Sequence, residues 1–306
     1  MLALYLRFSR VSAEPQRCAL LERALAGNHA VAVVTDWRAD AAALIAPLAG
    51  SMPSIAHAVW AQSEEPIGGF GYLATPVHLI AGIRDVRLSA EGVLSLSSDE
   101  AQALAADFNR IMKSSGFRLQ AVRSGQLVCL FNQPVHAETC DPAVALGRDI
   151  WDFQPTGPDA ARLRLLMSEI EMWLFDHPLN TARAERGLLA ISGLWMWGGG
   201  TLCSPLPALR GWVGGDDVLF GAFPMQQVFP DRILGSGVVV VKECPGTDSW
   251  AEVERRWLRP ALFALRIGRI SRLHLSAADR TYTLRPLSSW RLWRRLKPWW
   301  EYWNEY

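Results

Sequence analysis

Short apolar runs alternate with longer amphipathic runs along the first part of the chain. The runs 2–8 and 30–36 are rich in Leu, Val and Ala, which is typical of buried strands, whereas 16–27 and 40–50 have the apolar spacing of helices. Strands that alternate with helices favour a parallel sheet with helices on its faces. The start of the chain therefore predicts an α/β domain, followed by a Pro-, Gly- and Ser-rich loop at 51–71.

The pattern changes its rhythm after this loop. Two strand-like runs, a helical run and two further strand-like runs follow one another at 72–82, 86–97, 99–116, 117–122 and 125–131. Ser98 or Asp99 is expected to cap the helix, because both precede its apolar positions and accept hydrogen bonds from backbone N–H groups. This β-β-α-β-β order predicts an α+β module that is distinct from the opening.

A long amphipathic helix is predicted next, from Pro158 to about His177. Its apolar face consists of Leu163, Leu166, Ile170 and Leu174. Pro158 suits a first helical turn, and Pro178 cannot continue a helix, so the helix is expected to end near His177. A short second helix is predicted from Asn180, as its cap, to Gly187 as its stop.

A strand at 189–197 is then expected to run into a glycine loop. The glycines are Gly198, Gly199 and Gly200. One explanation is a tight turn, with Trp195 and Trp197 buried on one sheet face because they are two residues apart. The other is an anion site, in which backbone N–H groups of the loop act together with the charges of Arg183 and Arg186.

The remaining polar candidates have structural explanations beside their chemical ones. His177 has the intrinsic pKa of a general acid or ligand, but a histidine at a helix end also interacts well with the helix dipole. The loop 136–140, with Cys129 nearby, offers soft metal ligands, yet it lacks the second pair of a zinc site. Ser54 lies three residues before His57 but has no acidic partner in register, which favours loop packing over a nucleophile.

The last third of the chain continues the α/β pattern. A helix, a strand, a helix and two strands are predicted at 216–223, 237–241, 249–268, 269–276 and 281–286. A tail follows that contains five tryptophans and the cations Arg291, Arg294, Arg295 and Lys297. Such a tail suits docking on the sheet, and alternatively a partner surface.

Charge and cysteine content limit the environment. The 306 residues include 31 basic and 30 acidic side chains, so the field that attracts nucleic acid is missing and nucleic acid is disfavoured as a partner. No apolar run has the length of a transmembrane segment. Five cysteines, without a CxxC pair or a signal peptide, predict a cytoplasmic protein with reduced thiols.

From about Gly71 to its end the sequence resembles the RpfE-like regulatory proteins, a bacterial family. The resemblance is carried by 75–79, 145–188, 192–200 and 290–295. It implies a regulatory role in place of a defined reaction.

A more distant similarity links the chain to the archaeal-type cofactor-independent phosphoglycerate mutases of the alkaline phosphatase superfamily. The matching positions are His177, Pro178, Asn180, Arg183, Gly187, Gly198 and Gly200. Leu179 stands where those enzymes have valine. Their two metal ions and phosphoryl-carrying serine belong to motifs such as DxxGH, which this sequence lacks. The similarity thus implies that a binding module was kept while the metal chemistry was lost, with no metal and no cofactor.

These observations predict an α/β protein of two parts. Residues 1–71 and 201–306 are expected to form a reduced alkaline-phosphatase-like domain with a parallel sheet, and 72–200 an inserted α+β domain. The predicted function is a catalytically inactive, regulatory or ligand-sensing relative of the mutases. No catalytic residue is assigned. The predicted ligand-binding residues are His177, Asn180, Arg183, Trp195, Trp197, Gly198, Gly199 and Gly200.

The predicted ligand is a small phosphorylated or carboxylated metabolite. Two alternatives remain open at this point. One is an active phosphoglycerate mutase or phosphatase with a non-standard site, and the other is a scaffold that binds a protein partner through the Trp-rich tail.

Overall fold

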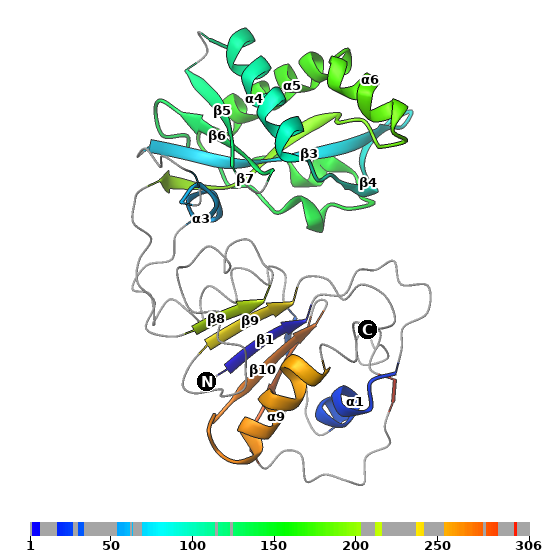
Figure 1. The fold of residues 1–306 in the computed structure, drawn as a ribbon, viewed down its shortest axis with the longest axis vertical. Coiled ribbons are helices and arrows are strands. Elements are labelled where there is room, and N and C mark those ends of the chain that lie inside the picture. Colours follow the sequence, from blue (N-terminus) through cyan, green and yellow to red (C-terminus); the bar gives the residue numbers. More distant parts are fainter. Residues whose placement is uncertain are drawn as a thin grey trace. The chain divides into compact units, whose positions relative to one another are not determined.

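The fold was analysed in a computed structural model, which divides the chain into two units (Figure 1). Unit 1 is Met1–Met52 with Pro207–Tyr306, and unit 2 is Pro53–Leu206. The structure describes residues 2–6, 17–26, 30–33, 54–61, 63, 69–113, 116–122, 125–202, 212–215, 237–241, 254–277, 280–286 and 297–298. The helices predicted at 40–50 and 216–223 and almost all of the Trp-rich tail lie outside these residues.

Unit 1 contains a six-stranded mixed sheet in the order β2-β11-β10-β1-β9-β8. Its strands are β1 (Leu2–Leu6), β2 (Ala30–Val33), β8 (Trp212–Gly215), β9 (Gly237–Val241), β10 (Leu273–Ala277) and β11 (Arg280–Leu284). Strand β1 pairs in parallel with β9 and β10, and β8 pairs in parallel with β9. Strand β11, in contrast, runs antiparallel to both β10 and β2. The sheet is therefore mixed and not purely parallel, because the short link between β10 and β11 permits a hairpin but no crossover.

Two described helices belong to unit 1, α1 (Ala19–Ala26) and α9 (Arg259–Arg266). A π-helical turn, Glu254–Leu258, leads into α9. The Cys18 thiol lies 3.6 Å from the Glu254 carboxylate and donates to it, which joins the start of α1 to this turn. Burial raises the pKa of this thiol to about 11, so Cys18 is an uncharged packing residue at neutral pH.

Unit 2 contains an antiparallel sheet built around the long strand β3 (Gly69–Ala81). The other strands are β4 (Val86–Val93), β5 (Phe117–Ala121), β6 (Leu127–Phe131) and β7 (Gly193–Leu202). Strand β3 pairs with β6 through 70–73 and with β4 through 77–81, while β7 follows it from 69 to 77. The predicted hairpin of β5 and β6 is present.

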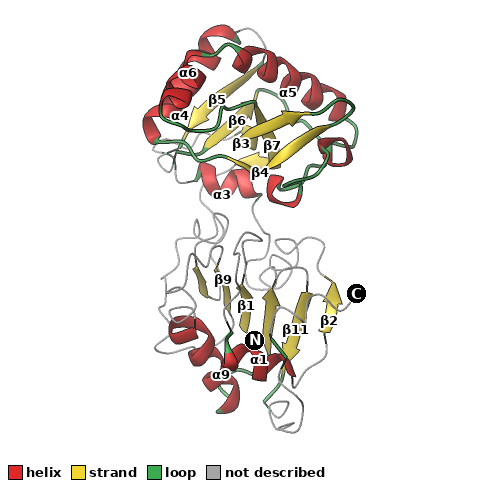
Figure 2. Cartoon of the chain, turned by 90° about the vertical axis from the view of Figure 1, so that its right-hand side faces the viewer, coloured by secondary structure: helices red, strands yellow, loops and turns green. Residues whose placement is uncertain are grey.

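Helices cover both faces of this sheet (Figures 1 and 2). On one face lie α4 (Ser98–Ile111), α5 (Ala160–Phe175) and α6 (Pro178–Glu185), and on the other α3 (Ile55–Trp60) contacts β7 and β3. Two single turns, η1 (Pro142–Val144) and η2 (Ile150–Phe153), lie in the segment between β6 and α5. None of the helices in the described part of the chain has the length and apolar character that a bilayer crossing requires.

The cap of α4 differs from the prediction. Ser97, and neither Ser98 nor Asp99, is the N-cap, and its hydroxyl accepts a hydrogen bond from the Glu100 N–H at 3.1 Å. The Glu100 carboxylate in turn accepts from the Ser97 N–H, which completes a capping box. Ser54 likewise caps α3 by accepting from the His57 N–H, so its spacing from His57 is explained by capping.

The core of unit 2 lies between the sheet and the layer of α4 and α5. Strands β3, β6 and β7 contribute alternate residues, and α5 contributes its predicted apolar face. Its buried members include Tyr72, Leu104, Phe108, Phe131, Leu163, Leu166, Ile170, Leu174, Leu194 and Met196. Trp195 and Trp197 point to the opposite face, because they alternate with Met196 along β7.

The glycine run forms a β-bulge within β7, and the predicted loop after the strand is wrong. Gly71 pairs with Gly200 and Leu73 with Trp197, so Tyr72 alone faces two glycines. Gly198 has φ +63°, a conformation that side chains with a Cβ rarely adopt. A Cβ at Gly198 would lie 2.7 Å from Ile55 Cβ, and one at Gly199 would overlap the Tyr72 ring. The glycines thus allow α3 and the Tyr72 ring to approach the strand closely.

Substitutions in the bulge test this explanation. Gly198→Ala and Gly199→Ala are each expected to lower the free energy of unfolding by about 2 to 4 kcal/mol, through backbone strain and overpacking. Gly69→Ala is the matched control, because a Cβ there meets no atom within 4 Å. Urea denaturation of the three variants measures the difference. Equal stability of Gly199→Ala and Gly69→Ala would contradict the close approach of Tyr72.

Candidate functional site

His177 begins helix α6 and does not end α5. Helix α5 stops at Phe175, and His177 is the N-cap of α6, accepting a hydrogen bond at Nδ1 from the Leu179 N–H at 3.2 Å. Pro178 occupies the first position of α6, where its missing N–H is no loss. The prediction that the His177 side chain interacts with the C-terminal end of α5 is therefore wrong, and only the His177 backbone N–H donates to the Leu174 carbonyl, at 3.2 Å.

Asn180 lies inside α6, and the prediction that it caps the helix is also wrong. Its amide nitrogen donates to the carbonyls of Leu174 and Ile191 at 2.9 and 3.0 Å, and its oxygen accepts from the Ile191 N–H at 2.8 Å. One side chain thus satisfies backbone groups at the end of α5 and just before β7. The physical role of Asn180 is to join three segments.

Arg183 is buried and paired with Glu100 at the start of α4. Its residue is 3% exposed, Nη1 lies 3.0 Å from Glu100 Oε1, and Nε donates to the Leu189 carbonyl at 2.9 Å. The more exposed Arg186 reaches the same oxygen at 3.3 Å. Burial raises the pKa of Glu100, but the Ser97 N–H and the two guanidinium groups outweigh it and hold the pKa below its usual value.

The His177 ring lies against Trp173 and near Asp107. Its centroid is 4.8 Å from that of Trp173 in an edge-on arrangement. Nε2 is 3.4 Å from Asp107 Oδ2 but lacks hydrogen-bond geometry. Burial lowers the pKa of His177, and the attraction of Asp107 opposes this only in part. The ring is therefore neutral at neutral pH.

The two tryptophans of β7 are buried and hydrogen-bonded. The Trp195 indole N–H donates to the Cys140 carbonyl at 2.9 Å, and that of Trp197 donates to the Thr75 hydroxyl at 2.7 Å. Both rings therefore have the partner that a buried indole requires. They secure the sheet face opposite the α4–α5 layer.

The structure brings His177, Asn180 and Arg183 together at the junction of α4, α5, α6 and β7. Trp195, Trp197 and the three glycines lie along β7 and not in a loop beside that junction. Each of the five side chains has an internal contact that explains it, and ligand binding at these eight residues stays a prediction. In the part of the chain that the structure describes, no three His, Cys, Asp or Glu side chains are grouped to hold a metal ion.

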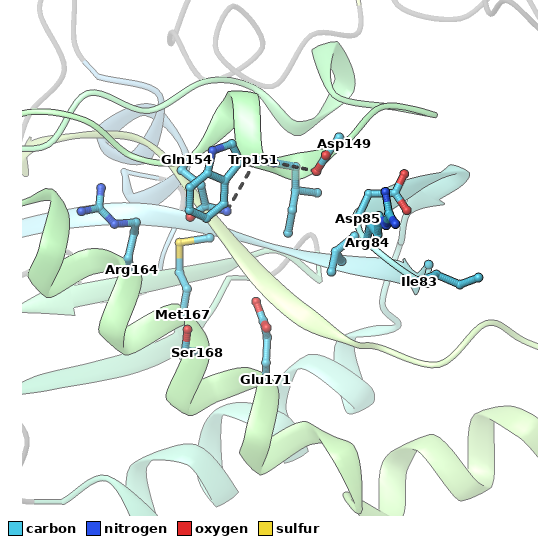
Figure 3. Close-up of a pocket in the computed structure, with 13 residues that line it drawn as sticks. Ile83, Arg84, Asp85, Asp149, Trp151, Gln154, Arg164, Met167, Ser168 and Glu171 are labelled. Atoms are coloured by element: carbon cyan, nitrogen blue, oxygen red, sulfur yellow. Dashed lines mark hydrogen bonds between the residues drawn. The ribbon is translucent and has the colours of Figure 1, made fainter.

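Unit 2 also has an open cleft of about 780 Å³ beside α5 (Figure 3). Three segments distant in sequence surround it: the β3–β4 turn, the η2 region and the middle of α5. The lining residues are 82–86, 149–151, Gln154, Arg164, Met167, Ser168 and Glu171. An isolated β-bridge between Arg87 and Asp149 joins the first two segments, and Arg164 Nη1 donates to the Pro155 carbonyl, which joins the last two. The three segments that line the cleft are thus connected by backbone pairing and by a hydrogen bond.

Glu171 and Trp151 are the chemically distinctive residues of the cleft. No hydrogen bond or ion pair connects Glu171 to any residue that the structure describes, and burial raises the pKa of its carboxyl. Trp151 is 79% exposed, although an indole is costly to leave in water. Asp149 caps η2 by accepting from the Trp151 N–H at 3.0 Å, which fixes the residue that carries the ring. A carboxylate without a partner among the described residues and an uncovered ring on a held backbone together can bind an organic ligand.

The cleft was missed in the sequence because its residues come from three separated segments. The spacing of Arg164, Met167 and Glu171, three and four residues apart, does mark one stripe of α5 beside its apolar face. A cation, a thioether and a carboxylate on one stripe are ordinary for a solvated helix. Only the approach of 82–86 and 149–154 makes that stripe a site.

Comparison with known proteins gives several structural likenesses, among them the two that follow. No protein-family model matches the chain, and no curated protein matches it. Its structure is similar to that of a cofactor-independent phosphoglycerate mutase from Thermoplasma acidophilum DSM 1728, with a TM-score of 0.36 and 13% identity, over 97% of this chain and 96% of that one. It is also similar to the PH0037 protein from Pyrococcus horikoshii, with a TM-score of 0.33 and 10% identity, over 92% of this chain and 85% of that one. At TM-scores this low, a function must be inferred from the chain's own residues.

The buried ion pair predicts unequal effects of two neighbouring arginines. Arg183→Met is expected to lower the free energy of unfolding by about 3 to 5 kcal/mol, because it leaves Glu100 buried without its main partner. Arg186→Met is the matched control and is expected to cost less than about 1 kcal/mol, since Arg186 is largely exposed. Urea denaturation compares them. Similar values for both would contradict a dominant role of Arg183.

The environment of His177 predicts a pH dependence of stability. Its pKa is lowered in the folded chain, so the unfolded chain takes up the proton more readily, and stability is lost as the pH falls below about 6.5. His177→Asn keeps a capping acceptor but removes this titration. We expect the unfolding free energy of this variant to fall less steeply between about pH 7 and 5 than that of the wild type.

The exposed His136 provides the control, because His136→Asn makes the same exchange outside the buried junction. Chemical denaturation at several pH values measures all three proteins. A steeper slope in His177→Asn would show that Asp107 stabilises the charged ring more than burial opposes it.

Proposed function

We propose that this protein is a regulatory, ligand-sensing relative of the cofactor-independent phosphoglycerate mutases that has no catalytic activity of its own. The observation that carries the proposal is that two different sets of residues in unit 2 join the helices and line the open cleft. The residues that resemble the mutase module hold the helices together, whereas the open cleft beside α5 contains an unpaired carboxylate and an uncovered indole.

The contacts of Arg183 argue against its use on a phosphate. A guanidinium that binds phosphate must present its N–H groups to the ligand. Arg183 is buried, and its Nε and Nη1 already donate to Leu189 and Glu100. Turning the side chain outward would leave the Glu100 carboxylate in the interior without its nearest cation, which is strongly unfavourable.

Helix α5 supports a sensing role because it connects the cleft to this framework. Glu171 and Leu174 lie one turn apart, and the Leu174 carbonyl accepts from Asn180. A ligand at Glu171 would therefore stabilise the helix whose end is bonded to α6. Binding and the order of the α5–α6 junction are linked by the same element.

The wider relationship is part of the same proposal. We assign the alkaline-phosphatase-like part to 1–71 and 201–306 and the insert to 72–200, on the strength of the sequence resemblance. A phosphorylated or carboxylated metabolite at His177, Asn180, Arg183 and the glycines remains an alternative ligand. It would have to displace the internal bonds of Asn180 and Arg183.

Turnover assays and ligand screening together test this function. The purified chain is expected to show no phosphoglycerate mutase or phosphatase turnover above a heat-inactivated control, with manganese or zinc added. Thermal shift against a panel of small metabolites is expected to identify a stabilising ligand, worth about 2.7 kcal/mol at 100 times its dissociation constant. Turnover would favour the active-enzyme alternative. The absence of both turnover and a thermal shift would favour a scaffold that acts through its tail.

A further inference from the structure

We propose that the cleft beside α5 binds a small organic amine, with its ammonium group at the Glu171 carboxylate and its flat apolar body on the Trp151 ring (Figure 3). This assignment names the class of ligand that the proposed sensing function would detect, and its biological role rests on that proposed function. The binding itself follows from the geometry of the cleft.

Glu171 provides the anchor for the cation. Its side chain projects from α5 toward the interior of the cleft, and its Cγ packs where a Cβ on Gly193 would lie 3.2 Å away. The aliphatic stem therefore lies close to the Gly193 backbone, and the carboxylate faces the cleft without a bonded partner among the described residues. A half-buried, unpaired carboxylate is destabilising, and its raised pKa has the same cause. A ligand cation removes this penalty more effectively than a neutral group does.

Trp151 and Met167 provide an apolar part of the cleft lining. Figure 3 shows the indole on η2 above the Met167 side chain of α5, with Glu171 one turn further along that helix. Met167 and Glu171 are four residues apart and therefore lie on one face of α5. A flat ligand that covers the indole thus places an attached amine near the carboxylate. Aromatic stacking and cation–π attraction both favour such a ligand.

The Glu171 carboxylate selects against anions at its own position. The cleft is also lined by Asp85, which is paired with Arg87 at 2.6 Å, and by Asp149, Arg84 and Arg164. Arg164 also donates to the Pro155 carbonyl, which holds it at the rim. Glu171 is half-buried whereas Arg164 is exposed, so a phosphate or carboxylate placed at Glu171 would meet repulsion.

Calorimetric titration of the full chain with tryptamine tests the proposal. Tryptamine carries the amine and the flat ring, tryptophol replaces the amine by a hydroxyl, and indole-3-acetate replaces it by a carboxylate. We expect saturable binding of tryptamine, at least about tenfold weaker binding of tryptophol, and no binding of indole-3-acetate. A tenfold change corresponds to about 1.4 kcal/mol, which is close to the lower end of the range of about 1.5 to 3 kcal/mol for a hydrogen bond to a charged group.

Three variants locate the site. Glu171→Gln keeps the shape and removes the charge, and Trp151→Ala removes an exposed ring; each is expected to weaken tryptamine binding at least about tenfold. Glu169→Gln is the matched control on the same helix, outside the cleft, and is expected to bind like the wild type. Thermal unfolding of each variant verifies that it is folded.

Two results would overturn the assignment: no saturable binding of tryptamine, or equal binding by the wild type and Glu171→Gln. Either result leaves the sensing function standing if the metabolite panel identifies another stabilising ligand. If the panel gives no ligand and tryptamine does not bind, both proposals fail.

Discussion

The pairing of β7 with β3 is the constraint on which the rest of unit 2 depends. Nine consecutive positions of β3, from 69 to 77, face β7, and the bulge at Gly198 changes the register within this ladder. The bulge places Gly199 against the Tyr72 ring, whose hydroxyl bonds to the backbone of Val135 and Ala137. One strand pair therefore determines where α3 packs on the sheet and where the segment after β6 begins. It also determines where α5 packs on β7.

A polar framework then fixes the helical layer on this sheet. Glu100 connects α4 to α6 through Arg183, and Asn180 connects α6 to the end of α5 and to the residue pair before β7. Glu100 and Arg183 are buried and Asn180 is half-buried, so each would be destabilising without its partner, and alternative packings of the helices would leave several unpaired at once. The framework therefore favours one arrangement of α4, α5 and α6.

Local patterns in the sequence predicted the elements but not how they meet. The apolar face of α5 and the hairpin of β5 and β6 follow from periodicity, because burial on one face needs no knowledge of the partner. Pro178 was assigned only as a helix stop, although the same residue begins α6, since a proline ends one helix and suits the first turn of the next. The pattern predicts a loop at the glycine run, because the Tyr72 ring that requires these glycines lies far away in the sequence. The cleft has the same non-local origin.

Glu171 connects these observations to function. The inward face of α5 packs in the core, and the Leu174 carbonyl at its end accepts a hydrogen bond from Asn180. The position of the helix is therefore determined without Glu171. A half-buried carboxylate without a bonded partner opposes folding, and arginines at 84 and 164 lie on the same cleft without pairing with it. The framework therefore holds Glu171 in an environment that it would not adopt by itself. A cationic ligand would relieve this cost within a site whose walls are already in place, so that little of its binding free energy is needed to order the protein.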